Sequence, residues 1–244
     1  MRQNRDGQHY ANRDLQMGTL YVVRHGQAAF GTEDYDRLTD LGQRQAHLLG
    51  RHFASLGLRF DAVVAGTLTR HMQTAQAILD GAGATHEVER ISALNEYDAM
   101  SVMTAFLGEP PSFDAKAAQR DPDSVRTHFR QLRDGLLAWA DGSTEPLGMP
   151  TFAVFQQQIM DTLHDLRLRF PDGNVLVSTS GGPVAAAVCA ALEAPAASAV
   201  HLNLHVRNTA ISTFKTTRKG LQLLSFNAIP HLDSSGDPAL SSYA

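Results

Sequence analysis

Three short apolar runs, each followed closely by polar residues, do most to limit the folds open to this chain. The runs cover residues 20–23, 62–64 and 175–177, and they are rich in β-branched side chains. Runs of this length and composition are typical of buried strands. Segments with apolar residues at helical spacing lie between them. Strands that alternate with helices form a mostly parallel sheet covered on both faces, so the sequence predicts a three-layer α/β/α fold.

Helix-start and helix-stop residues place the other expected elements. Thr39 is the expected N-cap of a helix that runs to about residue 56 and ends at Gly57, and Thr67 is expected to cap a helix through residue 79. Further strands are expected over residues 86–91, 174–179, 210–214 and 221–226, and further helices over residues 125–140, 152–170 and 183–192. We expect residues 99–170 to form a helical insertion and, from its position after the third strand, a lid.

Length and charge narrow the functional classes. The 244 residues, 43% of them apolar, predict one domain over residues 18–244 after a polar, flexible lead-in over residues 1–17. The net charge of -4 disfavours a nucleic-acid binder, and no apolar run is long enough to cross a membrane. The single cysteine, Cys189, excludes an intrachain disulfide and favours a reducing compartment, so we expect a cytoplasmic protein. The sequence leaves a homodimer open.

Four polar groups follow predicted strands, and parallel strands would bring them to one rim of the sheet. The groups are Arg24-His25-Gly26-Gln27, Thr67-Leu68-Thr69-Arg70, Leu94-Asn95-Glu96 and Ser178-Thr179-Ser180-Gly181-Gly182. Arginines and helix N-termini are preferred partners of phosphate. A carboxylate would repel an anion, but as a general acid it could protonate a leaving alcohol. Histidine can attack phosphorus and carry the group covalently. The four groups together therefore predict a phosphoryl-transfer site.

The chain resembles the histidine phosphatase superfamily, in its phosphoglycerate-mutase-like group. Four stretches match the family in order: the strand and Arg-His-Gly signature at residues 20–27, a Thr-x-x-Gly-x-x-Gln-Ala helix start at residues 39–46, Leu-x-Arg-x-x-Gln-Thr-Ala at residues 68–75, and Leu-x-Glu at residues 94–96. The likeness covers nearly the whole chain outside the lead-in and the helical middle. One tripeptide alone would be a weak signal, but four motifs in order are a strong one.

The resemblance implies a role for each of these residues. His25 would attack the phosphoryl group and form a phosphohistidine, and Glu96 would protonate the leaving oxygen and then activate water. Arg24 and Arg70 would clamp the phosphoryl oxygens, since fixed cations stabilise the charge that spreads over them. The remaining phosphate-binding candidates are Gln27, Thr67, Ser180 and Gly181. The family needs no metal and no cofactor, and the expected partner is a small phosphorylated metabolite or inorganic phosphate.

One departure from the family concerns Ser180. The family normally has a second histidine before the Gly-Gly pair, and serine is shorter and neutral. Loss of one charged donor costs about 2–4 kcal/mol of transition-state stabilisation, by analogy with oxyanion-hole deletions. That cost corresponds to roughly 30- to 1,000-fold in rate. His71, or His205 together with Arg207, could compensate for the change.

The resemblance implies a metal-independent phosphatase that hydrolyses a small phosphomonoester, and the sequence leaves three other functions open. Ser180 permits a weakly active or non-catalytic member that binds a phosphorylated ligand. A phosphoglycerate mutase-type phosphotransferase is less favoured, because residues 27–36 lack the tryptophan-asparagine pattern of those mutases. A serine hydrolase is remote: Ser178-x-Ser180-x-Gly182 resembles a nucleophile elbow. Its acid and base would have to come from Glu193 with His205 or His231.

Overall fold

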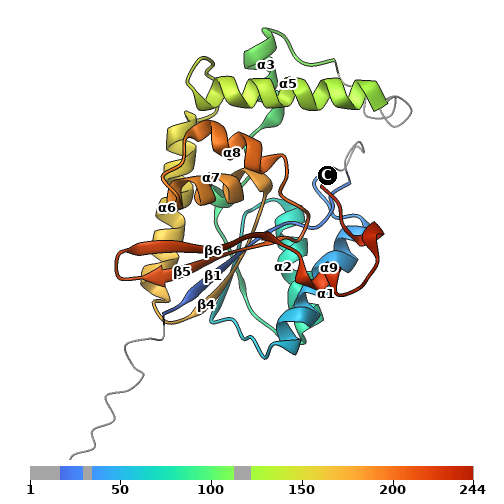
Figure 1. Cartoon of the computed structure of the whole chain (residues 1–244), viewed down its shortest axis with the longest axis vertical. Helices are drawn as coiled ribbons and strands as arrows, with labels where there is room; N and C mark the ends of the chain where they lie inside the picture. Colours follow the sequence, from blue (N-terminus) through green and yellow to red (C-terminus); the bar gives the residue numbers. More distant parts are fainter. Residues whose placement is uncertain (1–16, 30–34, 113–121, 244) are drawn as a thin grey trace, which may run out of the picture.

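The computed structural model describes residues 17–29, 35–112 and 122–243, which fold around one six-stranded sheet (Figure 1). The strands are β1 (Thr19–Arg24), β2 (Ala62–Ala65), β3 (Val88–Arg90), β4 (Asn174–Thr179), β5 (Ile211–Thr217) and β6 (Gly220–Ala228). Their order is β3-β2-β4-β1-β5-β6; the first four are parallel, and β5 and β6 are antiparallel to their neighbours. The predicted mostly parallel sheet is confirmed. Except for Met17, the predicted lead-in lies outside the described residues.

Helices cover both faces of the sheet, because successive strand residues point to opposite sides. Val23, Val63 and Leu176 share one buried cluster with α1 (Asp40–Ser55) and α2 (Thr69–Ala82). Val22, Val64 and Val177 share the other cluster with α6 (Phe152–Arg169) and α7 (Gly181–Ala191). Cys189 is buried and free in α7. The two clusters account for the predicted three layers.

The remaining helical segments are α3 (Ala99–Leu107), α5 (Pro122–Ala140), α8 (Ala196–Asn203), α9 (Pro230–Asp233) and two short turns, η1 (Ser92–Leu94) and η2 (Pro238–Leu240). Figure 1 shows α3 and α5 beyond α8, away from the sheet, whereas α6 runs along the sheet. The predicted insertion therefore contributes both to the core and to an outer layer. Residues 113–121 of it lie outside the described part, and its role as a lid stays a prediction. In the described ranges, no helix combines the length and apolarity needed to span a membrane.

Two predicted helix caps had different outcomes. Thr39 caps α1 as predicted, because its hydroxyl accepts from the backbone N–H of Gly42, and Gly57 ends that helix with φ +65°. The predicted cap at Thr67 was wrong: α2 begins at Thr69, after an apolar residue. Asp36, far away in the sequence, accepts from the N–H groups of Thr69 at 2.8 Å and of the next residue at 3.4 Å. A carboxylate from another segment thus replaces a local cap.

Glycines let α1 lie directly against the loop that follows β1. A Cβ atom on Gly26 would lie 2.4 Å from the carbonyl oxygen of Gly42, and one on Gly42 would lie 2.2 Å from that of Gln27. Real Cβ atoms do not approach backbone oxygens so closely. The start of α1 therefore fixes the path of the chain just after β1, where the predicted nucleophile lies.

Candidate active site

His25 lies in the loop after β1, buried against β4. Its backbone N–H donates to the carbonyl oxygen of Thr179 at 2.8 Å. Its Nδ1 lies 2.7 Å from the carbonyl oxygen of Gly26, and a carbonyl can only accept, so Nδ1 carries the proton. Burial, together with the charge of Arg24 and the neighbouring His71 and Arg70, holds the pKa of His25 well below its ordinary value. The ring is therefore neutral, and its unprotonated nitrogen is Nε2.

Several hydrogen bonds hold the backbone of this loop in place. The N–H of Gly26 donates to Thr74 Oγ1 at 3.0 Å, and the N–H of Gln27 donates to Gln45 Oε1 at 2.9 Å. From the other side, Asn208 Nδ2 donates to the carbonyl oxygen of His25 at 3.1 Å. The chain thus fixes His25, the predicted nucleophile, through its backbone on both sides. Gln45 and Thr74 lie in the matched motifs, but their role in holding the loop was not predicted.

Residues near the C-terminal end connect two of these supports. Gln45 Nε2 donates to the carbonyl oxygen of Leu240 at 2.7 Å and to Ser242 Oγ at 2.9 Å. Ser242 Oγ in turn donates to Asn208 Oδ1 at 2.9 Å, and the N–H of Asn208 donates to the carbonyl oxygen of Ser242. We call residues 240–242 the C-terminal clasp. It joins the support from α1 to the support from the loop before β5.

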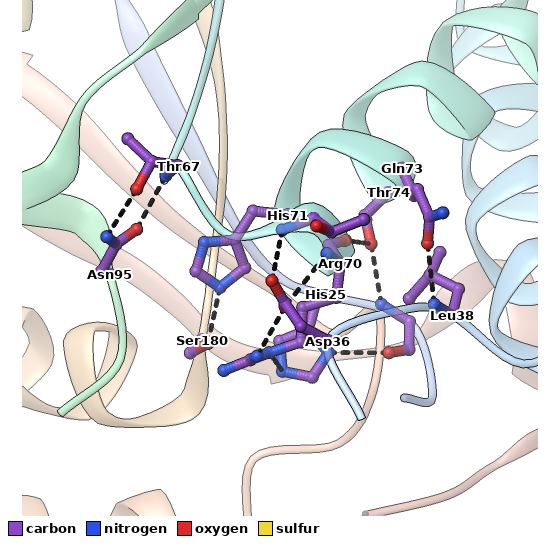
Figure 2. A network of polar contacts seen from close by, with 12 residues as sticks. His25, Asp36, Leu38, Thr67, Arg70, His71, Gln73, Thr74, Asn95 and Ser180 are labelled. Atoms are coloured by element: carbon purple, nitrogen blue, oxygen red, sulfur yellow. Dashed lines mark hydrogen bonds and ion pairs between the residues drawn. The ribbon is translucent and has the colours of Figure 1, made fainter. Parts of the chain in front are cut away.

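Arg70, in the first turn of α2, faces His25 (Figure 2). Its Nε donates to His25 Nε2 at 3.3 Å, and its Nη1 forms a 2.8 Å ion pair with Asp36. The Tyr35 ring lies 5.2 Å from the guanidinium carbon, at cation–π distance. Burial raises the pKa of Asp36, but N–H donors of α2 and the charge of Arg70 outweigh it and lower that pKa. Sequence reasoning missed Asp36, because nothing local marks a carboxylate whose partners lie more than thirty residues away.

Arg24, the last residue of β1, holds a second guanidinium at the same rim. Its Nη1 donates to the carbonyl oxygen of Val206, while its Nε is buried without a hydrogen-bond partner among the described residues. Burial lowers the pKa of Arg24, and the nearby carboxyl of Glu96 opposes that effect. A Cβ atom on Gly181 would lie 3.7 Å from Nε, so the first turn of α7 adjoins this donor. A buried donor left without a partner is an expected feature of a ligand site.

Glu96 follows η1 and reaches the same end of α7. Its Oε2 accepts from the N–H of Gly182 at 3.3 Å, and its buried Oε1 has no partner within the described part of the chain. Burial raises the pKa of Glu96, although the Gly182 N–H and the two arginines act against the shift. A Cβ atom on Gly182 would lie only 2.2 Å from Oε1, so glycine makes room for the carboxyl. A carboxyl that holds its proton more tightly than usual suits a general acid.

Ser180 and His71 form a buried pair beside His25. His71 Nε2 lies 2.6 Å from Ser180 Oγ, and both residues are fully buried. The ring centroids of His25 and His71 are 5.7 Å apart (Figure 2). Burial and the charge of Arg70 lower the pKa of His71 to about 3. The second imidazole of the site is therefore also neutral.

The other predicted phosphate-binding residues form different contacts. Thr67 is exposed and forms two hydrogen bonds with Asn95. Its backbone N–H donates to Asn95 Oδ1, and its hydroxyl accepts from Asn95 Nδ2, each at 2.7 Å. Figure 2 shows this pair apart from His25. The side-chain oxygen of Gln27 accepts from the Thr39 hydroxyl at 2.9 Å. Among the described residues, neither side chain forms a hydrogen bond to the groups around His25.

Of the residues predicted to compensate for Ser180 or to act with it, His205, Arg207 and His231 form contacts elsewhere in the fold. His205 is exposed and bonds the carbonyl oxygen of His201, and Arg207 bonds the backbone of Asn227. His231 bonds the hydroxyl of Thr209. Of the candidate histidines, His71 is the one whose ring contacts Ser180. The described ranges contain no group of three or more His, Cys, Asp or Glu side chains that could hold a metal ion.

The comparisons with known proteins agree with this geometry. The family model of the histidine phosphatase superfamily (branch 1) matches residues 20–229. A 2,3-bisphosphoglycerate-dependent phosphoglycerate mutase from Rhizobium meliloti is 39% identical over 89 residues, or 33% of this chain and 42% of the mutase. The chain thus spans less than half the length of this curated relative.

Solved structures show a similar fold. Phosphoserine phosphatase from Entamoeba histolytica, in complex with 3-phosphoglyceric acid, has a TM-score of 0.62 at 22% identity and covers 88% of this chain and 100% of its own. Phosphoglycerate mutase from Bacillus anthracis has a TM-score of 0.60 at 16% identity, with 92% and 100% covered. At these identities the likeness concerns the fold, which is phosphoglycerate mutase-like as predicted.

Proposed function

This chain belongs to the histidine phosphatase superfamily (branch 1), and on that premise we propose that it hydrolyses a small phosphomonoester through a phosphohistidine at His25. The observation that carries the proposal is the state of the His25 ring. Nδ1 carries the proton and donates to the carbonyl oxygen of Gly26, and the lone pair of Nε2 accepts from the guanidinium of Arg70. A neutral imidazole beside a fixed cation is both nucleophilic and close to where a phosphoryl group would bind.

In the first step, His25 Nε2 attacks phosphorus, the P–N bond forms and the ester P–O bond breaks. Glu96 gives its proton to the leaving oxygen, which departs as an alcohol. Arg24, through its unpaired Nε, and Arg70 balance the charge on the phosphoryl oxygens. Arg70 exchanges its bond to His25 Nε2 for one to a phosphoryl oxygen, since that lone pair is used in the new P–N bond.

In the second step, water attacks the phosphorus of phospho-His25 and the Glu96 carboxylate takes a proton from it. The P–N bond breaks, its electron pair returns to Nε2, and inorganic phosphate leaves. The proposed phosphate-binding set is Arg24, Arg70, Ser180 and the N-terminal turn of α7 at Gly181, whose N–H groups and dipole favour an anion. Each charge in this scheme is balanced by a residue of the chain, and we propose that no metal takes part.

The phosphate-containing ligands of structural neighbours guide the choice of substrates for the test. Wild type, His25→Ala and the exposed control His47→Ala are each incubated with p-nitrophenyl phosphate, phosphoserine and 3-phosphoglycerate, with and without a chelator. We expect wild type and the control to release phosphate, and to form an acid-labile phosphoenzyme, whether or not the chelator is present. His25→Ala should do neither.

Other results would identify the alternatives. A phosphoenzyme that persists in His25→Ala contradicts the assigned nucleophile. Interconversion of phosphoglycerates without net phosphate release indicates a mutase, as in the relative from Rhizobium meliloti. Absence of turnover, with inorganic phosphate still raising the melting temperature, indicates a phospho-ligand binder. Loss of activity with the chelator contradicts metal independence.

A further inference from the structure

Ser180 occupies a helix N-cap position without capping the helix. It follows the last residue of β4, which pairs with Arg24 at the end of β1, and it immediately precedes α7. A serine at this position usually accepts from a backbone N–H of the first helical turn. Here the side chain makes no such bond, and its Oγ lies 2.6 Å from His71 Nε2 instead. The hydroxyl is therefore available for something other than ending the helix.

The surroundings of His71 decide where its proton lies. Its Nδ1 is buried without a hydrogen-bond partner in the described part of the chain, against Gly66, where a Cβ atom would lie 2.2 Å away. A buried N–H without an acceptor is rarer than an acceptor left unfilled. The neutral ring therefore carries its proton on Nε2, and Nε2–H donates to Ser180 Oγ.

This arrangement fixes the role that Ser180 can play. Its oxygen accepts from His71, and no acceptor for its own hydrogen is found among the described residues. The hydroxyl stands at the rim where Arg24, Arg70 and His25 converge, so its free hydrogen can be directed at an anion there. A hydroxyl that accepts a hydrogen bond becomes a better donor, because bonds in a chain polarise one another.

We propose that His71 and Ser180 act as one unit, in which His71 Nε2–H orients and polarises the Ser180 hydroxyl so that it donates to a phosphoryl oxygen of the substrate. The proposal rests on the function proposed above. Ser180 would touch the substrate, and His71 would be a positioning residue that acts through it. The first turn of α2 would then contribute two residues to the site. Arg70 contacts His25 directly, and His71 acts through Ser180, which lies between β4 and α7.

The same contact could in principle make Ser180 a nucleophile with His71 as its base. That role needs an unprotonated Nε2 and a group that accepts a hydrogen bond from Nδ1–H, as the acid of a catalytic triad does. Nδ1 has no such partner among the described residues. The contact therefore fits a donor unit better than a hydrolase dyad.

A double-mutant cycle tests the unit, with Ser180→Ala, His71→Leu, the combination of both, and His47→Leu as an exposed control. Each single change should lower kcat/KM for p-nitrophenyl phosphate by about 10²-fold, the scale of losing one donor to a developing oxyanion. The combination should be no worse than either single variant, because either change already removes the unit. His71→Gln, whose amide can still donate to the hydroxyl, should recover much of the loss. A merely structural histidine would instead add its own defect in the Ser180→Ala background.

A binding measurement makes the result independent of turnover. Inorganic phosphate is titrated against each variant, and the rise in melting temperature is recorded. Weaker phosphate binding in both single variants, without a further loss in the combination, supports the unit even if wild type forms no phosphoenzyme and the proposed function fails. Phosphate binding and kcat/KM within twofold of wild type in Ser180→Ala or His71→Leu overturn it. Labelling of Ser180 by a fluorophosphonate, or ester turnover that depends on it, also overturns it in favour of the nucleophile.

Discussion

Nε of Arg70 lies 3.3 Å from Nε2 of His25, so one guanidinium contacts the lone pair of the proposed nucleophile before substrate arrives. A second nitrogen of the same guanidinium, Nη1, forms a 2.8 Å ion pair with Asp36. Arg70 is thus fixed in a single orientation at the centre of the site. The planar fork of arginine allows this double contact, which a lysine ammonium could not reproduce.

We therefore expect Arg70→Lys to lower kcat/KM by about 10²–10³-fold, the range seen when one oxyanion donor is removed. The charge is kept, so the loss reports the geometry of the fork rather than the sign of the charge. Steady-state kinetics with p-nitrophenyl phosphate would measure it. Arg126→Lys, in the exposed Arg126–Asp123 pair of α5, is the matched control and should stay within twofold of wild type. A comparable loss in both variants would contradict a specific role for Arg70.

The raised pKa of Glu96 predicts how activity falls at high pH. Only the protonated carboxyl can donate, so kcat/KM should decline as the pH rises through the pKa that burial has raised. Glu96→Gln should remove this decline and lower kcat/KM strongly for an alkyl phosphate. The loss should be smaller for p-nitrophenyl phosphate, because nitrophenolate leaves without a proton.

The measurement for Glu96 is a pH profile of kcat/KM with both substrates. Glu87→Gln, at an exposed position just before β3, serves as the control and should keep the wild-type profile. Equal losses for the two leaving groups in Glu96→Gln would mean that Glu96 is not the general acid.

The lowered pKa of His231 leads us to expect a loss of stability in acid. The hydroxyl of Thr209 donates to the carbonyl oxygen of Asn208 and so accepts from His231 Nε2–H, and His231 Nδ1 is buried without a described partner. Burial and the nearby His52 lower the pKa of His231 to about 3. Because this pKa is depressed, protons bind the unfolded chain first as the pH falls. The stabilisation is complete above the ordinary pKa of 6.5 and is lost between that value and about 3.

At about pH 5 the loss from His231 alone is about 2 kcal/mol. His231→Gln keeps a donor for Thr209 but cannot titrate. Between about pH 7 and pH 5, its free energy of unfolding should therefore fall by about 2 kcal/mol less than that of wild type. Urea unfolding at the two pH values measures the difference. His47→Gln, at an exposed site, should behave as wild type does. An unchanged pH dependence in His231→Gln would show that another group sets the acid limit.

The parts of this molecule that the sequence predicted are those set by local chemistry. The strand over residues 174–179 was predicted to the residue, because an apolar run there is bounded by Gly173 and by polar residues. Thr39 capped its helix because its partner, the N–H of Gly42, lies three residues away. In the site, Arg24 and His25 are adjacent in sequence and so were found together.

What the sequence did not reveal depends on contacts between distant segments. Asp36 caps α2 and holds Arg70 across more than thirty residues, and no periodic pattern marks such a carboxylate. His71 was one of several candidates to compensate for Ser180, and only the packing of α2 against the end of β4 selects it. That Thr67 binds phosphate stays a prediction, and its bonds to Asn95, the residue after η1, were not foreseen because the two residues lie far apart in the sequence.

The C-terminal clasp supports the loop that carries His25, the proposed nucleophile, so we expect residues 240–242 to affect catalysis through the position of that loop. Ser242 Oγ accepts from Gln45 and donates to Asn208, whose amide in turn holds the carbonyl oxygen of His25. Ser242→Ala removes this bridge and should cost about 1 kcal/mol of unfolding free energy, the net value of a typical hydrogen bond. It should also lower kcat severalfold, since small displacements of a nucleophile are costly. Urea unfolding and steady-state kinetics measure the two effects. Ser241→Ala, one residue away and outside the bridge, is the control, and equal effects in both variants would show that the clasp does not position His25.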